Sequence, residues 1–77
     1  MINLYDLNIN ACAKIISINN NDTGKIRLLE MGLMPSTEAR MIKKAPFGGP
    51  IQIKINNYYI TLRKEDAVDI IVQEVSK

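Results

Sequence analysis

The sequence has no histidine and only one cysteine, and both shortages limit the chemistry that the protein can perform. Histidine is the commonest general base and the commonest transition-metal ligand, so its absence excludes serine–histidine and cysteine–histidine catalysis. The single Cys12 can form neither an intramolecular disulfide nor a two-thiol zinc or redox site, and we interpret it as a small core residue. We therefore expect that the protein is not an enzyme and that it holds no metal and no cofactor.

Long apolar runs and a strong net charge are also missing. No stretch approaches the roughly 18 apolar residues that a transmembrane helix needs. Residues 1–6 have neither the basic start nor the apolar middle of a signal peptide. The net charge is +2, from 10 basic and 8 acidic side chains, which does not by itself indicate nucleic-acid binding. The sequence thus predicts a soluble protein whose default compartment is the cytoplasm.

What the sequence does contain is a series of short strand patterns. The predicted strands cover residues 11–18, 38–44, 51–55, 58–62 and 68–75. The side chains expected to face the core are Ala39, Met41, Ile51, Ile53 and Ile55. Asn56 and Asn57 favour a two-residue hairpin turn. Because a chain of 77 residues is too short to cover two sheets, we predict one domain over residues 1–77, a small closed barrel of about five strands.

One short helix is predicted between the first two strands. Asp22 or Thr23 can cap its start, and Gly32 tolerates the positive φ at which helices often end. Pro35 then prevents the helix from resuming. The apolar face is expected to consist of Ile26, Leu28, Leu29 and Met31, and we interpret the last three as core residues. A single helical turn is expected over residues 63–67.

A second proline-rich segment follows the strand over residues 38–44. Pro46 and Pro50 cannot donate ladder hydrogen bonds, and the two glycines between them allow a sharp turn. Phe47 is therefore held in a loop, where it can either contact a partner or cap the barrel. The residues alone leave these two alternatives open.

Three segments together resemble one known family. They are Arg27-Leu28-Leu29-Glu30-Met31-Gly32-Leu33-Met34-Pro35, Ala45-Pro46-Phe47-Gly48-Gly49-Pro50-Ile51 and Leu62-Arg63-Lys64-Glu65-Asp66-Ala67. In this order and spacing they resemble the ferrous iron transport protein A family, FeoA. The resemblance implies a mainly β, SH3-like barrel of five strands with one short helix. It also implies a cytoplasmic accessory or regulatory protein of ferrous iron uptake that binds the membrane transporter FeoB and meets the membrane only through that partner.

The resemblance and the exposed apolar positions together indicate a surface that contacts a partner protein. The candidate partner-binding residues are Met34, Pro35, Phe47, Gly48 and Tyr59. The residues assigned to the structural motif are Leu29, Gly32, Pro46, Pro50 and Arg63. Of the adjacent Tyr58 and Tyr59, which alternate in a strand, one is expected outside the barrel. Many family members have glycine at the positions of Asn10 and Ser36.

The charged residues have simpler interpretations. Arg63, Lys64, Glu65 and Asp66 are expected to form a solvated turn with weak surface pairs. An iron site would require Glu65, Asp66, Asp69 or Glu74 to converge, and oxygen ligands alone would select ferrous iron weakly. Lys14, Arg40, Lys43, Lys44 and Lys54 could share one sheet face, and we expect solvation to explain most of them.

Two other functions compete with the transporter-associated role. One is an SH3-like regulatory module of an iron-dependent repressor of the DtxR type. Such modules follow a DNA-binding and dimerisation domain, whereas this sequence begins with Met1 directly before the first expected strand. The other is a small barrel that binds nucleic acid through Lys43, Lys44 and Lys54. We expect no nucleic-acid partner, and the edge strands of an incompletely closed barrel leave homo-oligomerisation open.

Overall fold

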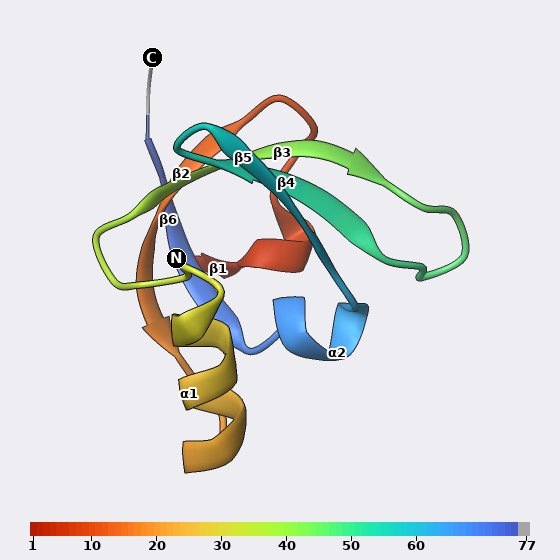
Figure 1. The fold of residues 1–77 in the computed structure, drawn as a ribbon. Helices are drawn as coiled ribbons and strands as arrows, with labels where there is room; N and C mark the ends of the chain where they lie inside the picture. The colour runs from red at the N-terminus through yellow and green to blue at the C-terminus, as the bar shows by residue number, and fades with distance from the viewer. Residues whose placement is uncertain (76–77) are drawn as a thin grey trace.

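The computed structural model describes residues 1–75 of the chain, and these form a curled antiparallel sheet with two helices against it (Figure 1). The strands are β1 (Ile2–Asn3), β2 (Cys12–Ile18), β3 (Glu38–Lys44), β4 (Ile51–Ile55), β5 (Tyr58–Leu62) and β6 (Ile70–Val75). The helices are α1 (Asp22–Glu30) and α2 (Lys64–Ala67), and a 3-10 turn covers Leu4–Asp6. None of the helices in residues 1–75 is long and apolar enough to cross a membrane.

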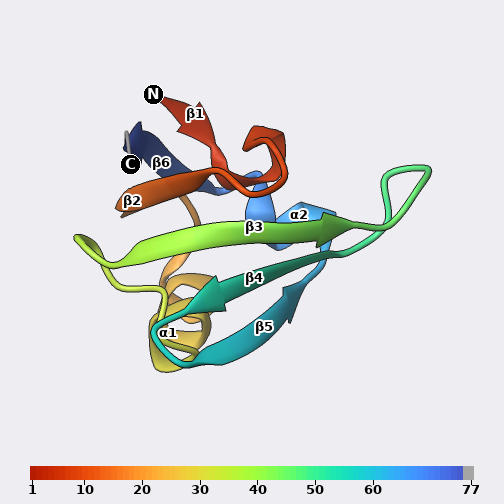
Figure 2. The same cartoon turned by 90° about the horizontal axis from the view of Figure 1, so that it is seen from above.

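The six strands are hydrogen-bonded in the order β1-β6-β2-β3-β4-β5. The sheet curls so strongly that β3, β4 and β5 lie across from β1 and β6 (Figure 2). This arrangement confirms the mainly β prediction. The structure adds β1, whose two residues pair with Val72 and Ile71 of β6. A strand of two residues has too little alternation to be recognised in the sequence.

The core lies inside the curl and includes the side chains that alternation predicted. Ala39 and Met41 of β3 are buried, as are the three isoleucines of β4. The Asn56–Asn57 turn is also confirmed, because Ile55 pairs directly with Tyr58 across it. Leu4 and Leu7 reach the same core from the 3-10 turn and its flank, which the sequence analysis did not include.

Two bulges adjust which side chains face the core. In β2 the register shifts between Ile15 and Ser17. Residues that are three apart in a regular strand point to opposite sides, but this bulge allows both Ile15 and Ile18 to be buried. In β3 a shift between Met41 and Lys43 places Lys44, not Lys43, opposite the inward-facing Ile51. Adjacent residues of a strand point to opposite sides, and the second bulge decides that Lys44 lies on the side of Ile51 and Lys43 on the side of Gln52. Lys44 consequently does not share the sheet face predicted for the other cations.

Helix α1 begins one residue earlier than predicted. Asn21 is the N-cap, and its side chain accepts a hydrogen bond of 2.8 Å from the backbone N–H of Gly24. Leu28 is buried, but Ile26 is exposed, so its assignment to the inward face is wrong. Two residues turn a helix by about 200°, which places Ile26 and Leu28 on opposite sides. Gly32 ends this region at φ 103°, as predicted.

Candidate functional site

The loop between β3 and β4 carries the most exposed aromatic ring of the described residues. Its ends are joined by a 2.8 Å bond from the Ala45 N–H to the Pro50 carbonyl, and Gly49 donates to Pro46 over 3.2 Å. Phe47 stands at the tip with its side chain fully exposed, at 104%. Its φ of 60° is unfavourable for a bulky residue. Such strain is held in place only by the surrounding structure, and it identifies the tip as a candidate functional element.

Tyr5 anchors this loop from below. It packs against the core, and its hydroxyl donates a 3.2 Å hydrogen bond to the Gly49 carbonyl. Tyr5 thus closes the core under the loop, and the capping alternative for Phe47 is wrong. The ammonium groups of Lys44 and Lys64 lie 5.7 Å and 5.4 Å from the centre of the Tyr5 ring, within cation–π range.

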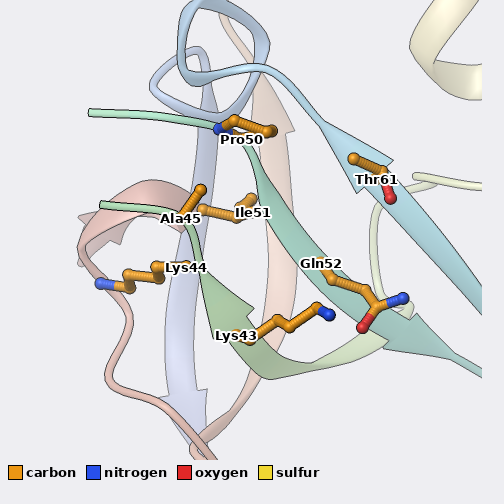
Figure 3. Close-up of a pocket in the computed structure, with 7 residues that line it drawn as sticks. All are labelled: Lys43, Lys44, Ala45, Pro50, Ile51, Gln52 and Thr61. Carbon is orange, nitrogen blue, oxygen red and sulfur yellow. The ribbon is translucent and has the colours of Figure 1, made fainter. Parts of the chain in front are cut away.

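A hollow of about 250 Å³ lies beside the base of the same loop (Figure 3). It is lined by Lys43, Lys44, Ala45, Pro50, Ile51, Gln52 and Thr61. Figure 3 shows the side chain of Lys43 extending toward Gln52, whereas that of Lys44 points the other way. The base of the loop therefore presents amines on both of its sides.

The segment that joins α1 to β3 also exposes an apolar side chain, but its backbone is tied into the barrel. Met34 is 56% exposed, while the adjacent Leu33 is fully buried. The Ser36 N–H donates to the Ile15 carbonyl over 2.7 Å, and Ile15 donates back to Thr37 over 2.9 Å. These bonds continue the pairing of β2 and β3 into the segment and hold its backbone to β2.

Tyr58 and Tyr59 lie beside this segment. The Tyr58 hydroxyl donates to the Met31 carbonyl over 3.4 Å, and a Cβ placed on Gly32 would overlap that hydroxyl. The ammonium nitrogen of Lys54 lies 5.8 Å from the centre of the Tyr59 ring, within cation–π range. The two rings are 43% and 57% exposed, so both contribute to the surface, whereas only one was expected to.

The candidate contact residues therefore fall into two groups at opposite ends of β3. Met34 and Pro35 precede this strand, and Tyr59 lies toward the same end, because its β4 partner Lys54 pairs with Arg40 near the start of β3. Phe47 and Gly48 follow the other end of the strand. Figure 2 shows the β3–β4 loop and the α1–β3 segment at the two extremes of the molecule.

The residues assigned to the structural motif lie in several different surroundings. Leu29 is partly buried and packs against the core. Gly32 turns the chain after α1, and Pro46 and Pro50 frame the Phe47 loop with exposed rings. Arg63 precedes α2, and its carbonyl accepts hydrogen bonds from the N–H groups of Asp66 and Ala67.

One of the charges expected in a solvated turn is not solvated. Asp66 is buried, and its carboxylate accepts a 2.7 Å hydrogen bond from the Arg27 guanidinium in an ion pair. This pair connects α1 to α2 and stabilises their arrangement. Arg63, Lys64 and Glu65 are exposed as expected.

The described residues contain no cluster of metal-ligating side chains. Within residues 1–75, no three histidine, cysteine, aspartate or glutamate side chains converge on one point. Cys12 is buried, as predicted, and it lines a hollow of about 220 Å³ together with Arg40 and Lys54. These two cations face each other across β3 and β4 on the outer side of the sheet.

Comparison with known proteins identifies the family. The FeoA domain model matches residues 2–74. The chain belongs to the FeoA family. A relative in Porphyromonas gingivalis, an Fe(2+) transport protein A/Fe(2+) transporter FeoB fusion protein, is 30% identical over 73 residues. That match covers 95% of this chain and 9% of the relative, so the chain corresponds to a small part of the fusion protein.

Solved FeoA structures have the same fold. The FeoA-like protein of Clostridium acetobutylicum is 32% identical with a TM-score of 0.87, over 99% of this chain and 88% of that one. FeoA of Stenotrophomonas maltophilia, a prokaryotic SH3 domain protein solved with zinc, is 27% identical with a TM-score of 0.82, over 95% and 91% of the two chains. These similarities confirm the SH3-like prediction for this FeoA-family chain.

The fold also occurs in a transcriptional repressor, although not one described as iron-dependent. A manganese-dependent transcriptional repressor has a TM-score of 0.86 but is 17% identical, over 95% of this chain and 36% of that one. At this identity the likeness shows a shared fold alone. It does not favour a role in gene control.

Proposed function

We propose that this protein is a cytoplasmic accessory or regulatory subunit of ferrous iron uptake that binds the cytoplasmic part of an FeoB-like transporter. Its membership of the FeoA family and the fusion of a related domain to FeoB support this proposal. A fusion keeps the two parts at high effective concentration, which is useful where they act together. The protein would act by contact, consistent with a sequence that has no histidine for general-base chemistry.

The observation that carries the proposal is the presentation of Phe47. A bulky residue at positive φ lowers the stability of the isolated protein, and a fully exposed ring gains nothing from packing. The presence of phenylalanine at this position is therefore better explained by a contact with a partner. Aromatic side chains are enriched among residues that dominate binding energy. The loop is braced by its own two hydrogen bonds and by Tyr5, so little conformational freedom remains to be lost on binding. We therefore place the primary contact at Phe47 and Gly48.

The other candidate residues occupy the opposite end of β3. In this proposal Met34, Pro35 and Tyr59 are either a weaker, second contact or a surface that stays exposed when the transporter is bound. The backbone of their segment is paired with β2. This difference between the two ends makes each a control for the other.

The test measures binding of the purified cytoplasmic domain of an FeoB-like transporter by isothermal titration calorimetry. We expect Phe47→Ala to weaken binding about thirtyfold, because truncating a central aromatic contact costs about 2 kcal/mol or more. Met34→Ala removes an exposed apolar side chain at the other end and is the matched control, for which we expect less than about a threefold change.

Both variants should unfold at the same denaturant concentration as the parent protein, since neither side chain is buried. Unchanged affinity of Phe47→Ala would remove the loop from the contact. If Met34→Ala lost affinity instead, the contact would lie at the other end of β3. Absence of any binding by the parent protein would contradict the proposed function itself.

A further inference from the structure

The base of the Phe47 loop carries two lysines that form no ion pair within residues 1–75. Lys44 and Lys64 both direct their ammonium groups at the ring of Tyr5. Within residues 1–75 neither lysine has a carboxylate within ion-pair distance, and the ion pair found there joins Arg27 to Asp66. We refer to Lys44 and Lys64 as the loop-base lysines.

The fold places the loop-base lysines directly under the exposed loop. A Cβ on Gly48, the residue after Phe47, would lie 3.7 Å from the ammonium nitrogen of Lys64. Lys44 comes from the strand that leads into the loop, and Tyr5, which both lysines face, bonds to the Gly49 carbonyl. The apolar tip and the cationic base therefore belong to one surface.

More positive charge lies on either side of this surface. Lys43 lines the adjoining hollow, and the exposed Arg63 directly precedes Lys64. The two segments at the base of the loop thus carry four cations, Lys43 and Lys44 on β3 and Arg63 and Lys64 at the start of α2, although the whole chain has a net charge of only +2. Like charges gathered in this way are unfavourable in the free protein, and an approaching carboxylate would relieve their repulsion.

We propose that this surface recognises an acidic patch of a partner protein that has an apolar recess for Phe47 and carboxylates positioned over the loop-base lysines. The inference rests on the proposed function and adds the chemistry of the transporter surface that is recognised. Phe47 supplies buried apolar area, while Lys44 and Lys64 supply attraction and orientation.

The shape of the loop favours a folded protein over an anionic lipid surface as the occupant. The tip offers one aromatic ring between two prolines and two glycines, and a single ring gives a small apolar area for insertion into a bilayer. The backbone is held at fixed angles by hydrogen bonds, and both lysines are held against one ring. Such preorganisation lowers the entropy cost of binding to a partner of fixed shape. It gives no such gain in binding to a fluid bilayer.

The test compares the parent protein with the double variant Lys44→Gln/Lys64→Gln, which keeps most of each side chain and removes both charges. The probe is the cytoplasmic domain of an FeoB-like transporter, titrated at low and at physiological salt. We expect the double variant to bind about tenfold more weakly at low salt and to show a smaller loss of affinity with added salt than the parent protein.

Lys54→Gln is the matched control. Lys54 also lies over a tyrosine ring, at 5.8 Å from Tyr59, but at the opposite end of β3. Its substitution removes one charge and one cation–π contact without touching the loop, so we expect affinity and salt dependence close to those of the parent. Circular dichroism and thermal unfolding confirm that each variant is folded.

The outcomes separate this inference from the function on which it rests. If the parent protein binds and the double variant has the same affinity and salt dependence, the acidic patch is contradicted while the proposed function stands. If the parent protein does not bind the transporter domain, the proposed function fails and the acidic patch fails with it. Phe47-dependent sedimentation of the protein with phosphatidylglycerol vesicles would overturn the inference in favour of a lipid surface.

Discussion

The two ends of β3 have similar sequence features but differ in structure. Each carries a proline and an exposed apolar residue, Pro35 with Met34 at the start and Pro46 with Phe47 at the end. At the start, backbone hydrogen bonds to β2 hold the segment against the barrel. At the end, the hydrogen bonds close the loop on itself and leave it projecting (Figure 2). Exposure of a side chain and projection of its backbone are therefore separate properties.

This difference shows how a small barrel can combine a stable scaffold with a binding element. The segment at the start of β3 carries Leu33 into the core, so changes in it should affect folding. The loop at the end is joined to the core by Tyr5, which donates to the Gly49 carbonyl, while the tip residue Phe47 is fully exposed, so the tip can vary with little effect on stability. We expect substitutions at the first end to change the free energy of unfolding and substitutions at the tip of the second to change binding.

The largest effect on stability is expected from Gly32→Ala. Gly32 has a φ of 103°, and an added Cβ would overlap the Tyr58 hydroxyl. We expect the free energy of unfolding to fall by about 2 kcal/mol, since positive φ alone costs a residue with a Cβ about 1–2 kcal/mol. Urea unfolding followed by circular dichroism measures the change.

Gly48→Ala is the matched substitution at the other end of β3. Gly48 also has a positive φ, 73°, but its added Cβ would meet only the end of Lys64, at 3.7 Å or more. We expect a loss of about 1 kcal/mol, from the backbone alone. In a Tyr58→Phe background, Gly32→Ala should approach that smaller value, and equal losses at both glycines in the parent protein would show that the overlap with Tyr58 has no energetic effect.

The next largest effect is expected at the ion pair that links the two ends. Arg27 lies on the helix that leads into the Met34 segment, and Asp66 lies on α2, which begins with Lys64 under the Phe47 loop. The side chain of Asp66 is only 12% exposed and that of Arg27 is 48% exposed. We expect Arg27→Ala to lower the free energy of unfolding by about 1 kcal/mol, because it leaves a mostly buried carboxylate without its partner.

Lys25→Ala on the same helix serves as the control for this prediction. Lys25 is exposed, and within residues 1–75 it is in no ion pair, so its truncation should change stability by less than about 0.5 kcal/mol. Arg27→Ala should also leave transporter binding unchanged if the contact is confined to the Phe47 loop. If the two variants were equally stable, the Arg27–Asp66 ion pair would contribute no net free energy, because its attraction would only offset the hydration that the two charges lose.

Local patterns predicted those parts of the fold that depend on neighbours in the sequence. The isoleucines of β4 alternate strictly, and strand geometry alone places them inside. The start of α1 was misplaced by one residue, because Asn21, Asp22 and Thr23 can all act as N-caps. The bulge in β2 was not predicted, since its cause is the burial of both Ile15 and Ile18 in a core shaped by other strands.

The candidate site was predictable only in its exposed part. Prolines and glycines around Phe47 indicate a loop from local chemistry. The convergence of Tyr5, Lys44 and Lys64 depends on three distant segments, and no periodicity connects them. The same holds for Asp66, whose partner Arg27 is 39 residues away. A pattern of mixed charges predicts solvation, and only the fold, which brings Arg27 of α1 to Asp66 of α2, shows that one of them is buried and paired.

The smallest expected effects concern two strained residues, one at each end of β3. Ser36 and Phe47 have φ values of 76° and 60°, which glycine adopts without strain. Ser36→Gly should raise the free energy of unfolding by about 0.5 kcal/mol, because the relieved strain slightly exceeds the added entropy of the unfolded chain. Asn10→Gly, at φ 73°, should gain less, since asparagine tolerates this region.

Phe47→Gly should also gain stability but lose transporter binding, whereas Ser36→Gly should keep it. If Phe47→Gly kept full affinity, the strain at the tip would have no connection with binding, and the two ends of β3 would be functionally alike.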